Sequence, residues 1–313
     1  MSCPACGLSE FSEKFLSVEK DYSLPGYLYL NCSSCGSIYL SDDKIKNQVD
    51  LTKAHSEHWY KEGNFRFAPD KDINARISLA KISALSIIDT CKLPNDIKIL
   101  DVGCGNGELV AAFVEESYDA IGVEPDANAF EAIEVNPDLK ERLINCGIEG
   151  LKNSNHPALK KPFDLIVLQD VLEHLYDPLS AIEMFLDKLK DDGYIYIGIP
   201  SGESLGMRYL KANAWNFMAP FHRTLFTKKG VDRMIKRKAL NVSLNFIPDN
   251  RHVWGSTRGI AYKANFSTEH AELRATLDGF SNYDFMVDEL FDKIAIDLDM
   301  QPHMSFFLQK KLN

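Results

Sequence analysis

Short apolar runs alternate with amphipathic stretches between residues 97 and 199. The apolar runs predict strands at residues 97–102, 120–123, 142–145, 163–168 and 193–199. Helices are predicted at 108–117, 127–135 and 178–190, the last with Asp177 as its N-cap and Pro178 in its first turn. Strands that alternate with helices are typical of a parallel sheet with helices on both faces. The pattern therefore predicts an α/β fold.

Four cysteines near the start of the chain form two C-x-x-C-G turns. Cys3 and Cys6 belong to the first turn, and Cys32 and Cys35 belong to the second. Four thiolates suit a tetrahedral zinc ion, and the turns predict a small zinc ribbon with a structural Zn²⁺. A redox pair is the alternative, because C-x-x-C also serves disulfide exchange. We expect the remaining cysteines to be small buried hydrophobes.

A glycine-rich loop follows the strand predicted at 97–102. Its sequence is Asp101-Val-Gly103-Cys-Gly105-Asn-Gly107, and a helix begins directly after it. Glu124 ends the next predicted strand, where a carboxylate can accept hydrogen bonds from ribose hydroxyls. The dinucleotide fingerprint G-x-G-x-x-G would need a glycine at position 108, which is Glu108, and a carboxylate there disfavours a pyrophosphate. The loop therefore predicts a nucleoside ligand without phosphates, with Asp101 near its cationic amino group.

These motifs resemble those of the class I S-adenosylmethionine-dependent methyltransferases over roughly residues 75–265. The glycine loop matches their first motif, Gly122-Val-Glu124-Pro125-Asp126 matches their second, and residues 163–178 are similar to their fourth strand and the loop after it. The resemblance implies a Rossmann-like, seven-stranded sheet and S-adenosyl-L-methionine as cofactor. It also implies cofactor contacts, which are Gly103 and Gly105 at the methionine part, Gly107 in the same loop, Glu124 at the ribose, Pro125 or Asp126 beside the adenine, Gln169 beside the sulfonium, and Asp170.

With that resemblance, the chain divides into four predicted segments. They are a zinc-binding module at 1–45, a helical cover or linker at 46–93, a methyltransferase domain at 94–266 and a C-terminal extension at 267–313. The linker contains a predicted helix at 73–90. A helix at 227–239 and strands at 241–247 and 259–264 complete the domain. An alternative places the last strand of the sheet at residues 304–309.

Three side chains are candidates for catalysis. His174 lies just past the fourth predicted strand and is the preferred general base, with Glu173 to orient it or to bind a substrate hydroxyl. His222 and Arg223, with Trp215 nearby, suit a sugar face and an anionic group. Each of these has a plainer alternative, since His174 can simply cap a helix and His222 can belong to a packed aromatic cluster. Arg251-His252-Val253-Trp254 repeats this combination of an aromatic residue with His and Arg. Tyr60, Phe65 and Arg66 are candidates for closing over the cofactor.

Charge and composition limit the classes of partner that the chain is expected to bind. Lys and Arg total 35 against 45 Asp and Glu, a net charge of −10, which disfavours nucleic acid. No apolar stretch has the length of a membrane span, and the start Met-Ser-Cys-Pro lacks a secretory signal. An odd cysteine count of seven indicates a reducing compartment, so we expect a cytoplasmic protein. The oligomeric state stays open.

The acceptor is the least determined part of the prediction. C-x-x-C-G pairs ahead of such a domain resemble bacterial methyltransferases associated with sugars, which implies an oxygen of a nucleotide-activated sugar or surface-glycan precursor. Gln169-Asp170-Val171-Leu172 differs from the Asn-Pro-Pro-Tyr of enzymes that methylate amino groups. The alternatives are a sugar C-methyltransferase, an RNA or protein methyltransferase with the zinc module as reader, and a non-enzymatic scaffold that binds the cofactor as a structural ligand.

Overall fold

The fold is taken from a computed structural model of the chain. It describes residues 2–18, 23–41, 44–57, 73–131, 137–214, 216–247, 295 and 297–311. The chain forms two compact units, each built from segments that are distant in sequence. We call residues 1–44, 199–238 and 247–305 the cysteine unit, and residues 45–198, 239–246 and 306–313 the sheet unit.

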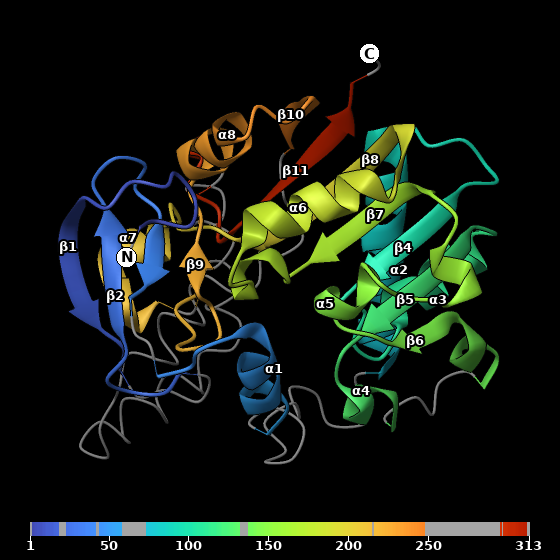
Figure 1. Ribbon diagram of the computed structural model, residues 1–313, viewed down its shortest axis with the longest axis horizontal. Coiled ribbons are helices and arrows are strands. Elements are labelled where there is room, and N and C mark those ends of the chain that lie inside the picture. Colours follow the sequence, from blue (N-terminus) through green and yellow to red (C-terminus); the bar gives the residue numbers. More distant parts are fainter. Residues whose placement is uncertain are drawn as a thin grey trace, which may run out of the picture. The chain divides into compact units, whose positions relative to one another are not determined.

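The sheet unit is built on a seven-stranded sheet (Figure 1). Its strand order is β10-β11-β8-β7-β4-β5-β6. The pairs β4–β5, β5–β6, β4–β7 and β7–β8 are all parallel. The strands are β4 (Lys98–Val102), β5 (Asp119–Glu124), β6 (Leu143–Asn145), β7 (Phe163–Gln169), β8 (Leu189–Pro200), β10 (Val242–Ile247) and β11 (His303–Lys310). The strands predicted between residues 97 and 199 are all present, and this Rossmann-like arrangement confirms the predicted α/β sheet.

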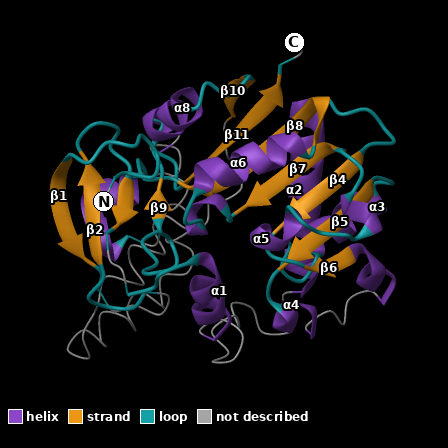
Figure 2. Cartoon of the chain, viewed as in Figure 1, coloured by secondary structure: helices purple, strands orange, loops and turns teal. Residues whose placement is uncertain are grey.

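Helices cover this sheet on both faces (Figure 2). Helix α3 (Glu108–Glu115) connects β4 to β5, and α6 (Pro178–Asp187) connects β7 to β8 in the opposite direction along the sheet. Because such crossovers are right-handed, the two helices lie on opposite faces. Helix α2 (Ile73–Cys91) packs against α3. This unit also contains α1 (Gln48–Ser56), α4 (Ala127–Glu131) and α5 (Ile148–Leu151).

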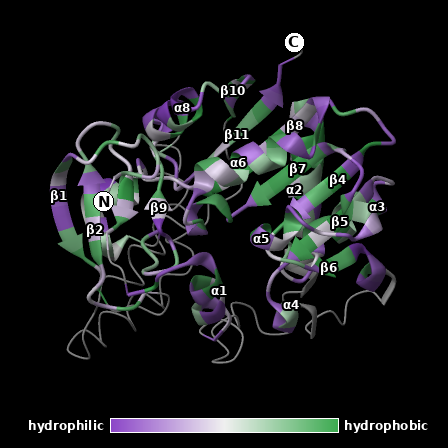
Figure 3. Cartoon of the chain, viewed as in Figure 1, coloured by the Kyte–Doolittle hydropathy of each residue, from purple (hydrophilic) through white to green (hydrophobic). Residues whose placement is uncertain are grey.

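The direction of the strand order reverses between β4 and β7. Both strands are buried along nearly their whole length, and most of β7 has the green colour of hydrophobic residues in Figure 3. Each ends in a polar loop, the glycine loop after Val102 and the Gln169–Asp170 pair after Leu168. Open α/β sheets bind ligands at such a switch point, outside the carboxyl ends of the strands. The fold therefore places the two predicted cofactor loops side by side.

The cysteine unit has its own four-stranded sheet, in the order β1-β2-β3-β9. Strands β1 (Phe11–Leu16), β2 (Leu28–Cys32) and β3 (Ile38–Leu40) come from the N-terminal segment, whereas β9 (Thr224–Leu225) lies some 180 residues further along the chain. Tyr29 and Phe217 form the centre of its core, with ring centroids 4.3 Å apart. Helices α7 (Leu205–Leu210) and α8 (Lys228–Arg237) complete the unit.

Two expectations concern the end of the chain. Strand β11 lies in the seven-stranded sheet between β10 and β8, at the position that the alternative for residues 304–309 had proposed. The strand expected at 259–264 lies outside the described residues.

The division into linear domains at 1–45, 46–93, 94–266 and 267–313 stays a prediction. No helix in the described part of the chain combines the length and hydropathy that crossing a membrane requires.

Candidate cofactor site and cysteine cluster

A cavity of about 420 Å³ lies in the sheet unit at the carboxyl ends of β4, β5 and β7. Its volume is in the range of small-molecule sites. Of the residues that the sequence predicted for cofactor binding or catalysis, eight line it, namely Gly103, Gly105, Glu124, Pro125, Asp126, Gln169, Asp170 and His174. Asp101, Gly107 and Glu173 lie behind the lining. The three predicted loops therefore contribute to one site.

The glycines of the loop after β4 have different roles. All three have positive φ angles, which favour glycine. A Cβ atom on Gly103 would lie 2.6 Å from Val171 Cγ2, and one on Gly107 would lie 2.8 Å from Leu143 Cδ1. A Cβ on Gly105 would meet nothing within 4 Å. Gly103 and Gly107 are therefore needed for packing, whereas Gly105 leaves open space at the cavity wall for a ligand.

Glu124 is held in place by backbone amides. Its Oε2 accepts a hydrogen bond from the amide of Gly105 at 3.2 Å, and its Oε1 accepts one from the amide of Asp126 at 2.9 Å. Burial raises the pKa of Glu124. Burial and the nearby Glu124 also raise the pKa of Asp101 to about 8. Two buried carboxyl groups so close together favour a cationic ligand, because a positive charge stabilises their ionised forms.

The residues that follow β7 present polar atoms to the cavity. Asp170 has a φ of 56°, an uncommon conformation for a residue other than glycine, and its amide donates to Gly198 O at 2.8 Å. Among the described residues, the buried Oε1 of Gln169 has no hydrogen-bond partner. Asp126 Oδ2 is in the same situation on the opposite side of the glycine loop. Buried polar atoms of this kind are normally satisfied by a ligand or by water.

Glu173 and His174 follow directly. The carboxyl of Glu173 is fully buried, and its Oε1 lies 3.8 Å from His174 Nε2. Burial, together with the nearby Asp170, raises the pKa of Glu173 well above its ordinary range. His174 is only partly buried and lines the cavity. The imidazole therefore faces the cavity while the carboxyl behind it is positioned to orient the ring.

Helix α1 covers the cavity, and sequence reasoning did not assign any of its residues to the site. Gln48, Leu51, Thr52 and His55 line the cavity from one face of the helix, at the spacing i, i+3, i+4, i+7. Gln48 Oε1 accepts a hydrogen bond from the amide of Tyr176 at 3.1 Å, which anchors the helix. The rings of His55 and His174 have centroids 5.6 Å apart and meet edge to face. The helical spacing was the available signal for this face.

The charge of the lining is strongly biased. Among the described residues around the cavity there are five carboxylates but neither lysine nor arginine; the acids are Glu108, Glu124, Asp126, Glu149 and Asp170. A site for a diphosphate would need cations or free amides at this position. The lining therefore disfavours a dinucleotide and favours a ligand with positive charge.

His222 belongs to the cysteine unit and is buried there. Its Nδ1 lies 2.6 Å from Asn216 O, and its own carbonyl accepts a hydrogen bond from the Tyr29 hydroxyl at 2.9 Å. These contacts match the alternative of a packed cluster, and the catalytic role of His222 stays a prediction. Trp215, residues 251–254 and the group Tyr60, Phe65 and Arg66 lie outside the described residues.

The four N-terminal cysteines lie together in the cysteine unit. Their sulfur atoms are all within 4.8 Å of one another, with Cys3–Cys35 at 3.8 Å and Cys6–Cys32 at 3.5 Å. The hydrogen bond between Cys3 and Cys35 raises the pKa of Cys3, and the same bond lowers the pKa of Cys35 to about 4. Cys3 and Cys35 therefore interact directly through their sulfur atoms, as expected of ligands brought together for one cation.

The two cysteine turns have the same backbone geometry. Gly7 donates to Cys3 O at 2.8 Å, and Gly36 donates to Cys32 O at 2.8 Å. The amides of Cys3 and Cys32 donate to the carbonyls five residues further along, at 2.8 and 2.9 Å. Both glycines have a φ near 80°. The two turns therefore have the same conformation, and both place their cysteine sulfurs in one cluster.

Comparison with known families decides the class of the chain. The family described as a methyltransferase domain matches residues 75–243, which is more than half of the chain. The chain belongs to this methyltransferase family. The matched residues include the glycine loop, Glu124 and the Gln169–His174 segment, so the membership confirms the predicted resemblance at the level of the family.

Relatives of this methyltransferase domain carry several activities. The chain is 28% identical to the ubiquinone biosynthesis O-methyltransferase of Haemophilus ducreyi, over 32% of this chain and 44% of that protein. It is 35% identical to an uncharacterized methyltransferase of Schizosaccharomyces pombe, over 31% of this chain and 38% of that protein. The chain thus spans less than half the length of these relatives. The plantazolicin methyltransferase BpumL, solved with SAH and a triazolic desmethylPZN analog, shares the fold at a TM-score of 0.51 and 17% identity, over 85% of this chain and 98% of BpumL.

Proposed function

We propose that the chain is an S-adenosylmethionine-dependent methyltransferase that acts on an oxygen atom of a small-molecule acceptor. The observation that carries this proposal is the cavity at the switch point, with five carboxylates and no lysine or arginine among its described lining residues. S-adenosylmethionine has a sulfonium and an ammonium group and no phosphate, so its charges complement this lining. Family membership over residues 75–243 supports the same conclusion.

The residues present fit the cofactor group by group. Glu124, with its carboxylate fixed by two amides, is suited to accept hydrogen bonds from ribose hydroxyls. The open space at Gly105 suits the methionine part, with Asp101 behind it as counter-charge for the amino group. The unsatisfied oxygen of Gln169 suits a neighbouring positive sulfur. When bound, the cofactor supplies a methyl group on a cationic sulfur that leaves as a neutral thioether.

His174 is the proposed general base. A hydroxyl acceptor must lose its proton as it attacks, and an imidazole with a near-neutral pKa is suited to take it. The Oε1 of Glu173 lies 3.8 Å from the Nε2 of the ring, and His55 faces the ring from α1. Leu51 and Leu175 line the same cavity and limit the access of water to the imidazole.

For the acceptor we propose an oxygen of a nucleotide-activated sugar or surface-glycan precursor. The O-methyltransferase names of several relatives support oxygen as the methylated atom. The sugar class is supported by the paired C-x-x-C-G turns in front of the catalytic segment. Incubation with methyl-tritiated cofactor and a panel of nucleotide sugars tests it. Label transfer only to quinols or peptides would contradict the sugar class while leaving methyl transfer in place.

We further propose that the cysteine cluster binds a structural Zn²⁺ ion through Cys3, Cys6, Cys32 and Cys35. Zinc with sulfur bonds of about 2.3 Å gives a tetrahedron whose edges are roughly 3.8 Å. The sulfur separations of 3.8 and 3.5 Å are close to this value. The repeated turn geometry supports a metal over a redox pair, because a redox pair would need only one turn.

Calorimetric titration tests the cofactor assignment. We expect the native chain to bind S-adenosylmethionine and S-adenosylhomocysteine and not NADH. Glu124→Gln keeps one oxygen for the backbone amides but loses the charge, so affinity for the cofactor should fall about tenfold or more. Glu141→Gln, an exposed residue outside the cavity, is the matched control. Tight binding of NADH with no heat from the sulfonium compound would overturn the proposal.

A further inference from the structure

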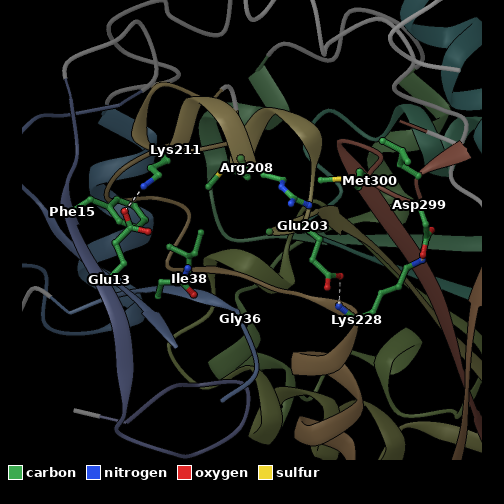
Figure 4. Close-up of a pocket in the computed structure, with 14 residues that line it drawn as sticks. Glu13, Phe15, Gly36, Ile38, Glu203, Arg208, Lys211, Lys228, Asp299 and Met300 are labelled. Carbon is green, nitrogen blue, oxygen red and sulfur yellow. Dashed lines mark hydrogen bonds and ion pairs between the residues drawn. The ribbon is translucent and has the colours of Figure 1, made fainter. Parts of the chain in front are cut away.

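A second cavity of about 560 Å³ lies entirely within the cysteine unit (Figure 4). One wall comes from the N-terminal strands, with Glu13 and Phe15 on β1, Asn31 on β2 and Ile38 on β3. The other walls come from the segment after β8 and from a short stretch late in the chain; they contribute Gly202, Glu203, Met207, Arg208, Lys211, Lys228, Leu298, Asp299 and Met300. The methyl-transfer proposal uses none of these residues.

Specific contacts join these walls. The amide of Leu205 donates to Met300 O at 3.0 Å, and the amide of Lys228 donates to Glu203 Oε2 at 2.8 Å. Lys228 Nζ pairs with Asp299 at 2.5 Å, and Lys211 pairs with Glu13. Each contact ties together segments that are far apart in sequence. The shape of the cavity is therefore fixed by the protein itself.

The charges inside the cavity are balanced but not fully paired. Three cations face three carboxylates, and both lysines are engaged by acids. Arg208 has no ion-pair or hydrogen-bond partner among the described side chains, although three acids line the same cavity. In Figure 4 its guanidinium lies between the Lys211–Glu13 pair and the Lys228–Asp299 pair. The five N–H donors of the Arg208 guanidinium are thus available toward the middle of the cavity.

Hydrogen-bond acceptors lie opposite this donor. Glu203 gives Oε2 to the amide of Lys228, which leaves Oε1 as an acceptor toward the cavity. Asn31 adds an amide group. Phe15 supplies a flat apolar surface and is itself held by Phe217, with ring centroids 5.3 Å apart. Arginine is the preferred partner of phosphates and carboxylates, whereas a carboxylate such as Glu203 accepts from hydroxyl groups.

We infer that this cavity binds a small organic anion that also carries hydroxyl groups. Its phosphate or carboxylate lies on the guanidinium of Arg208, and its hydroxyls donate to Glu203. A sugar phosphate and a sugar acid share this chemistry. The inference concerns the cysteine unit alone and does not depend on methyl transfer in the sheet unit.

The whole chain, residues 1–313, is prepared in the presence of Zn²⁺ and titrated calorimetrically with four probes. Glucose 1-phosphate and glucuronate carry both the anion and the hydroxyls, glucose carries only hydroxyls, and inorganic phosphate carries only the anion. We expect at least one of the first two to bind about tenfold or more tightly than glucose and than phosphate. Comparison of glucose 1-phosphate with glucuronate identifies the phosphate or the carboxylate as the natural group.

Two substitutions locate the binding. Arg208→Gln should weaken the better anionic sugar about tenfold or more, whereas Lys229→Gln, an exposed residue on α8 outside the cavity with the same change in charge, should not. Glu203→Gln keeps an oxygen for the amide of Lys228 and should weaken the sugar anion more than inorganic phosphate. An unchanged unfolding transition of the cysteine unit in differential scanning calorimetry confirms for each variant that this unit is folded. Equal affinity in R208Q and the native chain, phosphate binding as tight as that of the sugar anions, or no binding of any probe would overturn the inference.

Discussion

The two cavities of this chain differ in electrostatic character. In the sheet unit, the described lining has five carboxylates and no lysine or arginine. In the cysteine unit, three carboxylates face three cations, and one of these cations, Arg208, has no side-chain partner in the part of the chain that the structure describes. A net charge of −10 does not reveal this contrast, because it sums over both. The placement of a few charges decides what each cavity can bind: a cation in the first, an anion in the second.

The two units also differ in what fixes their backbone. The sheet unit relies on buried parallel strands such as β4 and β7, and its glycine loop is stabilised by packing against Val171 and Leu143. The cysteine unit has a smaller sheet, and its N-terminal segment is tied to α8 through polar contacts. Thr227 Oγ1 donates to Cys35 O at 2.6 Å, and the Thr227 amide donates to Ser37 Oγ at 3.2 Å. The N-terminal segment that carries the four cysteines contributes only three short strands, so its fold is expected to depend on a metal ion for stability.

The largest effect should follow loss of the cysteine cluster. Cys32→Ser removes one of four ligands, and we expect the cysteine unit to lose more than about 4 kcal/mol of stability, because zinc binding is coupled to folding. Differential scanning calorimetry should show a low-temperature transition in C32S, while the transition of the sheet unit stays near its native position. Treatment of the native chain with a strong chelator should reproduce the change.

Cys146→Ser is the matched control for this prediction. Cys146 lies outside the cluster and is partly exposed, so the variant should keep one zinc per chain by elemental analysis. Equal zinc content and equal unfolding in C32S and the native chain would show that the cluster holds no structural metal.

The next largest effect concerns the chemistry of the sheet unit. His174→Gln should lower kcat about 10²- to 10⁴-fold, because a positioned general base contributes this much. Affinity for S-adenosylmethionine should be unchanged by calorimetry. His55→Gln should lower kcat less, since His55 contacts the ring of His174 from α1 rather than replacing it as base. An H174Q variant with native kcat on an oxygen acceptor would rule out this base.

Sequence reasoning succeeded where the signal is local. The strands from 97 to 199, the glycine loop and the Asp177 N-cap each depend on neighbouring residues, and Asp177 Oδ1 indeed accepts from the amide of Ser180 at 3.0 Å. It did not find His55, because α1 hardly separates apolar from polar residues and carries no recognised motif. It also could not find the joining of β3 to β9, a pairing between residues 38–39 and 224–225. Long-range contacts of this kind leave no periodicity in the sequence.

Two glycines of one loop offer a sharper test of the sheet-unit cavity. Gly105→Ala places its methyl group in open space, so the fold should persist at a modest strain cost of about 1–2 kcal/mol while cofactor affinity falls about tenfold. Gly107→Ala brings its methyl group to 2.8 Å from Leu143 and should lower the melting temperature more than G105A does. Calorimetric Kd values and melting curves separate the two. The reverse order of effects would mean that Gly105 does not border the cofactor.

The smallest effect is a pH dependence that only the acidic cavity should show. Asp101 has a pKa of about 8 in the free chain, and a bound cation favours its ionised form, so binding of S-adenosylmethionine releases a proton below that pH. Affinity should therefore rise with pH, by at most about tenfold per pH unit, between pH 6 and 7.5, where the amino group of the cofactor remains charged. Asp101→Asn should flatten this slope, and Asp119→Asn, an exposed acid at the far end of β5, should preserve it. An anion bound in the cysteine unit has no reason to follow the same slope, because Asp101 lies in the other unit. A native profile that falls over this interval would show that Asp101 does not face a cation.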